Sequence, residues 1–212
     1  MKQLTLIAAV ALTALPGCSD LDEKEGHEEN WSAVAADYAS AFENASPLQL
    51  FFKEDRTRAI FQQESSNDTF FTEETSWLSE NYVEILLERN GVAGYSIYRI
   101  TESTVEIVYE GASKLEATLT ELEQMPSKGI FLSLPLEVGA TFDGWFVTHV
   151  DWQVHTPFDT FEQRTVTSKK VSKEEIQRYF APGFGLVKET RNTATDGLQD
   201  EASYHLYQLE YQ

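Results

Sequence analysis

Apolar and polar residues alternate one by one in several short segments of this chain, and this period of two constrains its fold most. In residues 81–89 apolar side chains occupy every second position, with glutamates at two of the positions between them. An extended strand places alternate side chains on opposite faces, so this pattern is typical of a half-buried strand. The Asn90-Gly91 dipeptide that follows favours the tight turn of a β-hairpin. A strand, a turn and a returning strand are therefore predicted.

The same pattern recurs through the rest of the chain. Further predicted strands cover residues 95–100, 104–110, 141–155, 160–170, 186–191 and 203–211. Pro182-Gly183 favours a type II turn, and Asp196-Gly197 favours a turn between the last two strands. Consecutive strands joined by tight turns predict an antiparallel sheet. We expect a mainly β fold, an antiparallel meander, half-barrel or sandwich, with one or two short helices.

Two segments favour helices. Residues 31–45 are rich in alanine, with a serine placed to cap the helix start. Residues 114–125 carry leucines at helical spacing, namely Leu115, Leu119 and Leu122. We expect the second segment to form a short helix, or a helical connection, over one face of the sheet.

The first residues have the parts of an export signal. Lys2 supplies a positive start, and residues 4–15 are apolar except for two threonines. As a helix this run spans about 18 Å at about 1.5 Å per residue, whereas a bilayer core is about 30 Å thick. Residues 1–17 are therefore predicted to be a cleaved signal peptide.

The run ends in a sequence that resembles the lipobox of bacterial lipoproteins, Leu15-Pro16-Gly17-Cys18. The resemblance implies that signal peptidase recognises Leu15 and Gly17 and that Cys18 receives the lipid. Pro16 departs from the usual small residue, and ordinary signal cleavage is the alternative. Cys18 is the only cysteine, so the exported chain can form no internal disulfide. Two or three acyl chains make a durable membrane anchor.

The stretch after Cys18 is strongly acidic. Residues 18–30 are predicted to be a disordered tether that follows the lipidated cysteine, because they contain almost nothing apolar to bury. Residues 31–212 then form a single β-rich domain. The formal net charge of −19 argues against nucleic-acid binding and against adsorption to anionic lipid. The lipid is thus the expected contact with the extracytoplasmic face of the cell membrane.

Five aromatic residues crowd into residues 145–161. We expect a ligand or partner face that includes Trp145, Val147, Trp152 and Phe158. A sheet that is apolar on both faces must be covered by something. The cover is either the helix of residues 114–125 or a bound apolar ligand or envelope protein.

Catalytic signatures are not found in the sequence, which lacks the nucleophile elbow, the phosphate-binding glycine loop and the paired-histidine zinc helix. His149 and Asp151 lie two apart on one predicted strand and could meet a third metal ligand, although simple hydrogen bonding on a polar face is the plainer interpretation. No catalytic residue, metal or cofactor is therefore predicted. A hydrolase of the cell envelope that uses carboxylates from several strands is the alternative.

Two later segments resemble a family. Leu134–Trp145 (LPLEVGATFDGW) and Phe180–Glu189 (FAPGFGLVKE) are similar to uncharacterised lipoproteins found mainly in Gram-positive, endospore-forming bacteria. The resemblance implies a β-rich domain behind a lipobox and an acidic tether, and it implies no activity. The expected function is that of a non-enzymatic, membrane-anchored lipoprotein that binds an apolar ligand or an envelope protein.

Overall fold

A computed structural model describes residues 46–64, 66, 69–195 and 198–212 of the chain. The predicted signal peptide, Cys18, the tether and the helix of residues 31–45 lie outside the described residues. The predicted Asp196-Gly197 turn lies outside them as well, although the strands on either side of it pair with each other.

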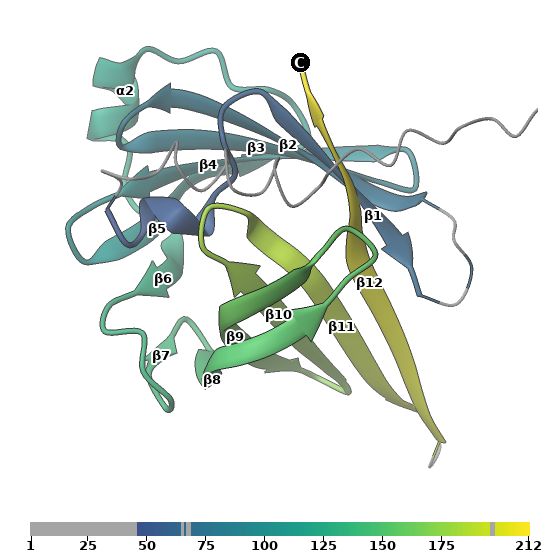
Figure 1. Ribbon diagram of the computed structural model, residues 1–212. Coiled ribbons are helices and arrows are strands. Elements are labelled where there is room, and N and C mark those ends of the chain that lie inside the picture. Colours follow the sequence, from purple (N-terminus) through teal and green to yellow (C-terminus); the bar gives the residue numbers. More distant parts are fainter. Residues whose placement is uncertain (1–45, 65, 67–68, 196–197) are drawn as a thin grey trace, which may run out of the picture.

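Twelve antiparallel strands form one sheet (Figure 1). Their bounds are β1 Thr57–Gln63, β2 Thr69–Ser79, β3 Tyr82–Arg89, β4 Val92–Ile100, β5 Thr104–Gly111, β6 Gly129–Ser133, β7 Thr141–Phe142, β8 Trp145–His155, β9 Thr160–Val171, β10 Glu174–Ala181, β11 Gly185–Thr195 and β12 Leu198–Tyr211. The predicted mainly β fold class is confirmed.

The sheet is a meander with one long-range pairing. Its order is β6-β5-β4-β3-β2-β1-β12-β11-β10-β9-β8-β7, so β1 pairs with β12 in the middle and β6 and β7 form the two ends. The sheet curls until these ends approach each other, and the backbone N–H of Ile130 in β6 donates to the Asp143 carboxylate beside β7. The result is a nearly closed, barrel-like sheet with an interior (Figure 1).

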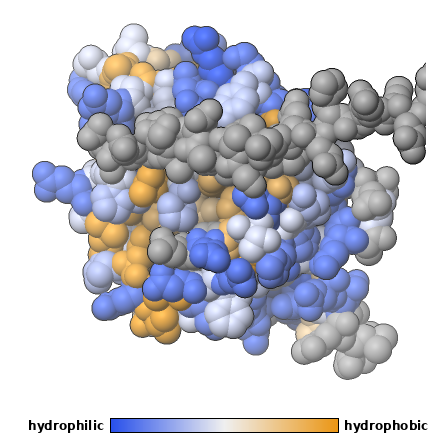
Figure 2. Space-filling view, viewed as in Figure 1, coloured by the Kyte–Doolittle hydropathy of each residue, from blue (hydrophilic) through white to orange (hydrophobic). Residues whose placement is uncertain are grey.

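The segment before β1 packs against this sheet. A short 3-10 helix, η1 (Gln49–Phe51), contacts β10 and β11. The Gly183 N–H donates to the Leu50 carbonyl at 2.8 Å. Gly185 has a φ of +59°, and a Cβ there would lie 2.9 Å from the Phe51 carbonyl oxygen. The turn between β10 and β11 thus needs a glycine for both conformation and space. Figure 2 shows apolar side chains gathered on this side of the molecule.

Two predicted turns are confirmed by positive φ angles. Asn90 and Gly91 have φ values of 52° and 74° between β3 and β4, as a two-residue hairpin turn requires. Gly183 has a φ of 78°, as the third position of a type II turn requires.

The prediction of one strand over residues 141–155 is wrong. Asp143 and Gly144 have φ values of 42° and 77° and form a tight turn that separates β7 from β8. Asp151 has a φ of 57°, and the pairing of β8 with β9 shifts register three times. Each shift changes which side chains share a face, because the side-chain period of a strand is two. The expected continuous apolar face is therefore interrupted, and Trp152 is 50% exposed.

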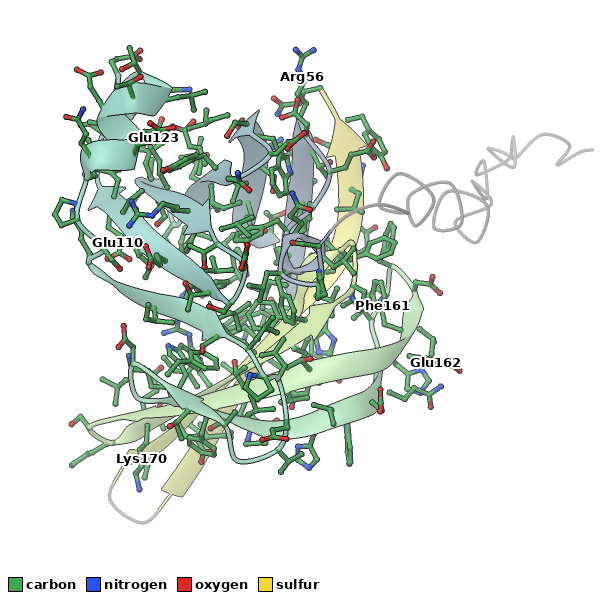
Figure 3. All side chains as sticks on the ribbon, turned by 90° about the vertical axis from the view of Figure 1, so that its left-hand side faces the viewer. Arg56, Glu110, Glu123, Phe161, Glu162 and Lys170 are labelled. Atoms are coloured by element: carbon green, nitrogen blue, oxygen red, sulfur yellow. The ribbon has the colours of Figure 1, made fainter. Side chains whose placement is uncertain are left out.

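The helix of residues 114–125 is shorter than predicted. Helix α2 spans Leu119–Gln124, because Thr118 caps it: the Glu121 N–H donates to the Thr118 hydroxyl, and the Thr118 N–H donates to the Glu121 carboxylate. Leu122 is buried against the outer face of β3, β4 and β5, together with Tyr82, Ile97 and Val108. Figure 3 shows α2 and Glu123 outside the curve of the sheet. The helix therefore covers a different surface from the one around Trp145.

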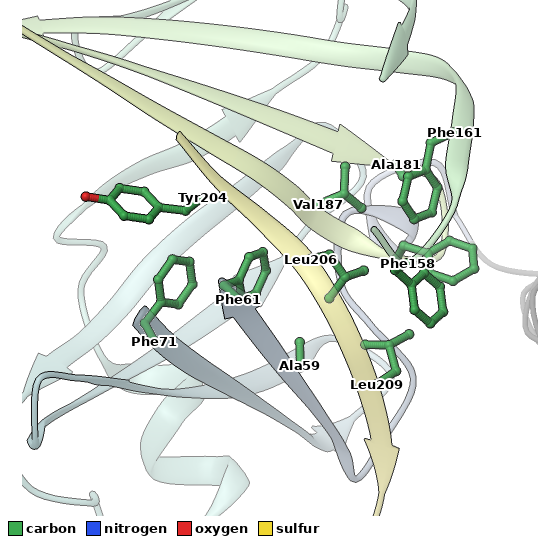
Figure 4. Packing of buried hydrophobic residues seen from close by; sticks show 11 residues of the cluster. Ala59, Phe61, Phe71, Phe158, Phe161, Ala181, Val187, Tyr204, Leu206 and Leu209 are labelled. Carbon is green, nitrogen blue, oxygen red and sulfur yellow. The ribbon is translucent and has the colours of Figure 1, made fainter. Parts of the chain in front are cut away.

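A buried aromatic cluster fills the part of the interior next to β1 and β12 (Figure 4). Phe61 and Phe71 stack with ring centroids 4.2 Å apart. Phe158 and Phe161 reach the same cluster from the β8–β9 connection and from β9, and the Phe158 N–H donates to the Leu206 carbonyl.

The described helices are too short or too polar to span a bilayer.

Candidate binding site

A cavity of about 470 Å³ occupies the remaining interior of the barrel-like sheet. Its size falls within the roughly 300–1,000 Å³ of small-molecule sites. Strands from both halves of the sheet contribute to its walls, as does the segment around η1. Seven aromatic residues give these walls much of their apolar surface, namely Phe51, Phe52, Phe71, Tyr98, Phe131, Trp145 and Phe180.

Five of these aromatic rings form a connected series. Ring centroids lie 5.3 Å apart between Phe52 and Tyr98, 4.8 Å between Tyr98 and Phe131, and 5.8 Å between Phe131 and Phe180. Phe51 extends the series, with its ring 5.6 Å from that of Phe180. Such tilted and edge-to-face pairs stabilise one another. The apolar wall is therefore held in place by its own contacts.

Basic residues are concentrated at this cavity. The lining contains five of the chain's 16 lysines and arginines but only four of its 35 aspartates and glutamates. The interior therefore carries a small surplus of positive charge in a protein whose formal net charge is −19.

Three arginines converge on one buried carboxylate. Glu189 in β11 is 2% exposed at its side chain and accepts from Arg191 Nε at 2.8 Å, Arg178 Nε at 3.1 Å and Arg89 Nη2 at 3.2 Å. Burial alone would raise the pKa of Glu189, but the positive charges of Arg178, Arg191 and Arg89 outweigh it and lower the pKa. Arg191 also pairs with Glu174 at 3.3 Å. The cluster stays ionised at neutral pH.

Two cationic side chains lie over the ring of Trp145. The Arg178 guanidinium carbon lies 4.7 Å from a Trp145 ring centroid, and Lys169 Nζ lies 5.7 Å from it. Lys169 Nζ also donates to the Asp143 carbonyl at 3.0 Å. Cations over tryptophan are attracted by the ring's negative face. Apolar surface and positive charge therefore meet at this residue.

A buried lysine lies close to the cavity wall. Lys53 is fully buried, and its Nζ donates to the Glu73 carboxylate at 2.5 Å and to the Leu186 carbonyl at 3.2 Å. Because Glu73 lines the cavity and Lys53 precedes β1, this ion pair fixes the segment between η1 and β1 to the cavity wall.

Tyr98 contributes a hydroxyl to the cavity. Burial raises its pKa to about 12, and the opposing charge of Arg178 lowers it only partly. The hydroxyl therefore keeps its proton at neutral pH and can donate a hydrogen bond.

The structure brings together only two of the four predicted face residues. Trp145 lines the cavity and packs against the buried cluster that contains Val147. Trp152 is exposed beside His149, with ring centroids 4.4 Å apart, and Phe158 is buried in the cluster of Figure 4. The bulges of β8 separate Trp152 from Trp145 and Val147. Cys18, Leu15 and Gly17 lie outside the described residues.

The charged residues of the cavity were missed by the sequence analysis, although one signal pointed to them. Arg89 is in phase with the apolar residues Ile85 and Leu87, and all three line the cavity. A register shift between β4 and β5 leaves Val108 as an extra residue and turns Glu110 inward, where simple alternation would place it outside.

One group of residues resembles a hydrolase triad only in composition. Ser203 Oγ and Glu64 Oε2 each lie 3.1 Å from the same nitrogen, Nε2 of His205. A catalytic relay places the nucleophile on one ring nitrogen and the carboxylate on the other. Burial lowers the pKa of His205, with the Lys188 charge next in effect.

The described residues show no cluster of three or more metal-ligating side chains.

Comparisons with known proteins leave the family open. No protein-family model matches the chain, and no curated protein matches it. Two solved structures are similar, each with a TM-score of 0.44 and 10% identity, covering 76% of this chain and 98% of theirs. One is named as an exported protein with a YmcC-like fold from Bacteroides fragilis, and the other as a lipoprotein from Parabacteroides distasonis. Likenesses this distant identify neither family nor function, and the resemblance to lipoproteins of endospore-forming bacteria stays a prediction.

Proposed function

We propose that this chain is a lipid-anchored, extracytoplasmic lipoprotein whose barrel-like domain binds a small apolar molecule. The observation that carries the proposal is the cavity of about 470 Å³, walled by connected aromatic rings. Ligand sites are typically concave and largely apolar, with a few placed polar groups. The anchor rests on the lipobox-like sequence that ends at Cys18.

The shape of the site favours a small molecule over an envelope protein. The apolar rings lie inside the curve of the sheet, whereas a protein partner needs a broad outer surface. The exposed aromatic residues of β8 are divided by bulges and do not form one such surface.

The same geometry supports a non-enzymatic role. The Glu189 carboxylate is held by three arginines, and the Glu73 carboxylate is held by Lys53. A general acid or base exchanges a proton near neutral pH. The lowered pKa of Glu189 keeps it ionised instead, so it suits a structural role.

Filling the cavity tests this proposal. Ser96 in β4 lines the cavity, so Ser96→Phe should occupy ligand space. Val92 in the same strand is 71% exposed, and Val92→Phe adds an aromatic ring outside. We would titrate both variants with the fluorescent neutral probe N-phenylnaphthylamine, using full-length protein that carries Cys18→Ala so that no lipid is attached.

The parent protein and Val92→Phe should bind the probe equally, and Ser96→Phe should bind it at least about tenfold more weakly, a difference of 1.4 kcal/mol. Circular dichroism would verify that both variants fold. No binding by the parent protein, or equal binding by a folded Ser96→Phe variant, would contradict the proposal.

A further inference from the structure

The charged groups at the cavity do not balance locally. Around Glu189, three arginines face two carboxylates, because Glu174 also pairs with Arg191. This leaves a surplus of one positive charge. Lys169, whose Nζ donates to a backbone carbonyl near Trp145, and Lys128 also line the cavity, and Glu110 and Asp143 offset these two charges, so the surplus stays at one.

The arginines also retain hydrogen-bonding capacity. Each guanidinium has five N–H groups, and only one nitrogen of each arginine donates a hydrogen bond to Glu189. For Arg178 this nitrogen is Nε, so its two Nη groups are not used by Glu189. The Nε of Arg89 is buried and makes no hydrogen bond. Guanidinium forks match carboxylate and phosphate oxygens.

The arginines are held in position before any ligand binds. Arg89 lies over the rings of Phe70 and Phe71 at 4.9 and 4.8 Å, and Arg178 lies over Trp145 at 4.7 Å. Glu189 holds the same two guanidinium groups through hydrogen bonds. Little conformational entropy is then lost when an anion binds, which favours affinity.

Apolar and cationic surfaces adjoin each other in this cavity. Trp145 stacks with Arg178 and also lines the same cavity as the aromatic series around Phe131 and Phe180. A molecule with both an apolar body and a charged end would satisfy both surfaces. A purely apolar molecule would lie beside the buried cations without compensating their charge.

We propose that the cavity binds an amphipathic molecule with one anionic head group, a carboxylate or a phosphate, recognised by Arg178, Arg191 and Lys169. The apolar body lies among the aromatic rings. This inference rests on the proposed ligand-binding function and names the chemical class of the ligand. The acidic exterior repels anions in general, so selectivity comes from these local contacts.

A displacement assay separates this inference from the function on which it rests. N-phenylnaphthylamine bound to the full chain with Cys18→Ala would be displaced by dodecanoate, dodecyl phosphate and dodecanol. These competitors share an apolar chain and differ in the head group. We expect dodecanoate or dodecyl phosphate to bind at least about tenfold more tightly than dodecanol. The tighter of the two identifies the head group.

Matched lysine variants locate the head group. Lys169→Met removes a cavity cation, whereas Lys170→Met removes the exposed neighbouring lysine on β9 (Figure 3) with the same change in net charge. Lys169→Met and Arg178→Gln should weaken binding of the preferred anion about tenfold more than they weaken binding of dodecanol. Lys170→Met should change neither. Lys169→Met keeps the test decisive if Arg178→Gln does not fold, because Lys169 makes no ion pair with Glu189.

Three results would overturn the inference. Equal affinity for dodecanol and both anions would remove the head-group preference, while leaving the binding function intact. Equal loss of anion affinity in Lys169→Met and Lys170→Met would show a general charge effect. Failure of the neutral probe itself to bind would refute the binding function, and the inference with it.

Discussion

The buried Lys53–Glu73 ion pair gives the sharpest test of how the segment between η1 and β1 is held against the sheet. We expect Lys53→Met to destabilise the protein strongly, because Lys53 is fully buried and the Glu73 side chain is only 13% exposed. Removing the lysine leaves a mostly buried carboxylate without its partner.

The magnitude follows from this burial. Breaking one partner of a buried pair costs about 3–5 kcal/mol, and we expect a loss in this range for Lys53→Met. Replacing both partners by apolar residues removes the uncompensated charge. Lys53→Met with Glu73→Leu should therefore be more stable than Lys53→Met alone.

The neighbouring glutamate supplies a matched control. Glu74 follows Glu73 in β2 and pairs with Arg58 at 3.3 Å, but both side chains are about one-third exposed, at 33% and 34%. Exposed pairs contribute roughly 0–1 kcal/mol. Glu74→Gln should therefore cost no more than about 1 kcal/mol.

Urea unfolding followed by tryptophan fluorescence would measure these free energies. The reasoning is refuted if Lys53→Met costs no more than Glu74→Gln. It is also refuted if the double variant loses as much stability as Lys53→Met and Glu73→Leu lose together when each is made alone, because the two residues would then not interact.

Three further changes test other parts of the structure. Gly185→Ala should cost at least about 1–2 kcal/mol in urea unfolding, because its φ of +59° disfavours a side chain and the Cβ meets the Phe51 carbonyl; unchanged stability would contradict the close approach. The pKa of Glu189 is lowered in the folded protein, so its ionised carboxylate stabilises the fold at pH values above 4.5, the ordinary pKa of a glutamate. This contribution is lost as the pH falls below 4.5 towards the folded-state pKa. Glu189→Gln should therefore be less stable at pH 7 and show a flatter decline in acid, and parallel pH profiles would disprove the assignment. Radioactive palmitate should label the wild-type chain, whereas Cys18→Ala should lose both label and membrane association; a labelled mutant would exclude lipidation at Cys18.

Local patterns were sufficient to predict two turns and six of the twelve strands, namely β3, β4, β5, β9, β11 and β12. Asn90-Gly91 and Pro182-Gly183 adopt the positive φ angles that their residue types favour. The Asp143-Gly144 turn has the same kind of signal, but the apolar residues around it suggested an unbroken strand. The capping residues Thr118 and Glu121 carried a signal for the start of the helix, but the leucine spacing led to a predicted start at residue 114.

The cavity could not be predicted in the same way, because it depends on long-range pairing. Arg89 and Glu189 are 100 positions apart and meet only when the sheet has curled. Register shifts such as the one at Val108 depend on the partner strand, and each reverses the face of the residues that follow. Arg89 carried a readable signal, since an arginine in phase with buried apolar residues needs a partner.

The pairing of β1 with β12 also affects how the domain assembles. Arg58 and Glu210 face each other across this pair although 152 positions separate them. Hairpins within each half can form early from neighbouring sequence, but the two halves cannot join until β12 reaches β1. Non-local pairings of this kind slow folding. Until they join, β1 exposes an unpaired edge, so a domain that folds after export would benefit from chaperone protection during this interval.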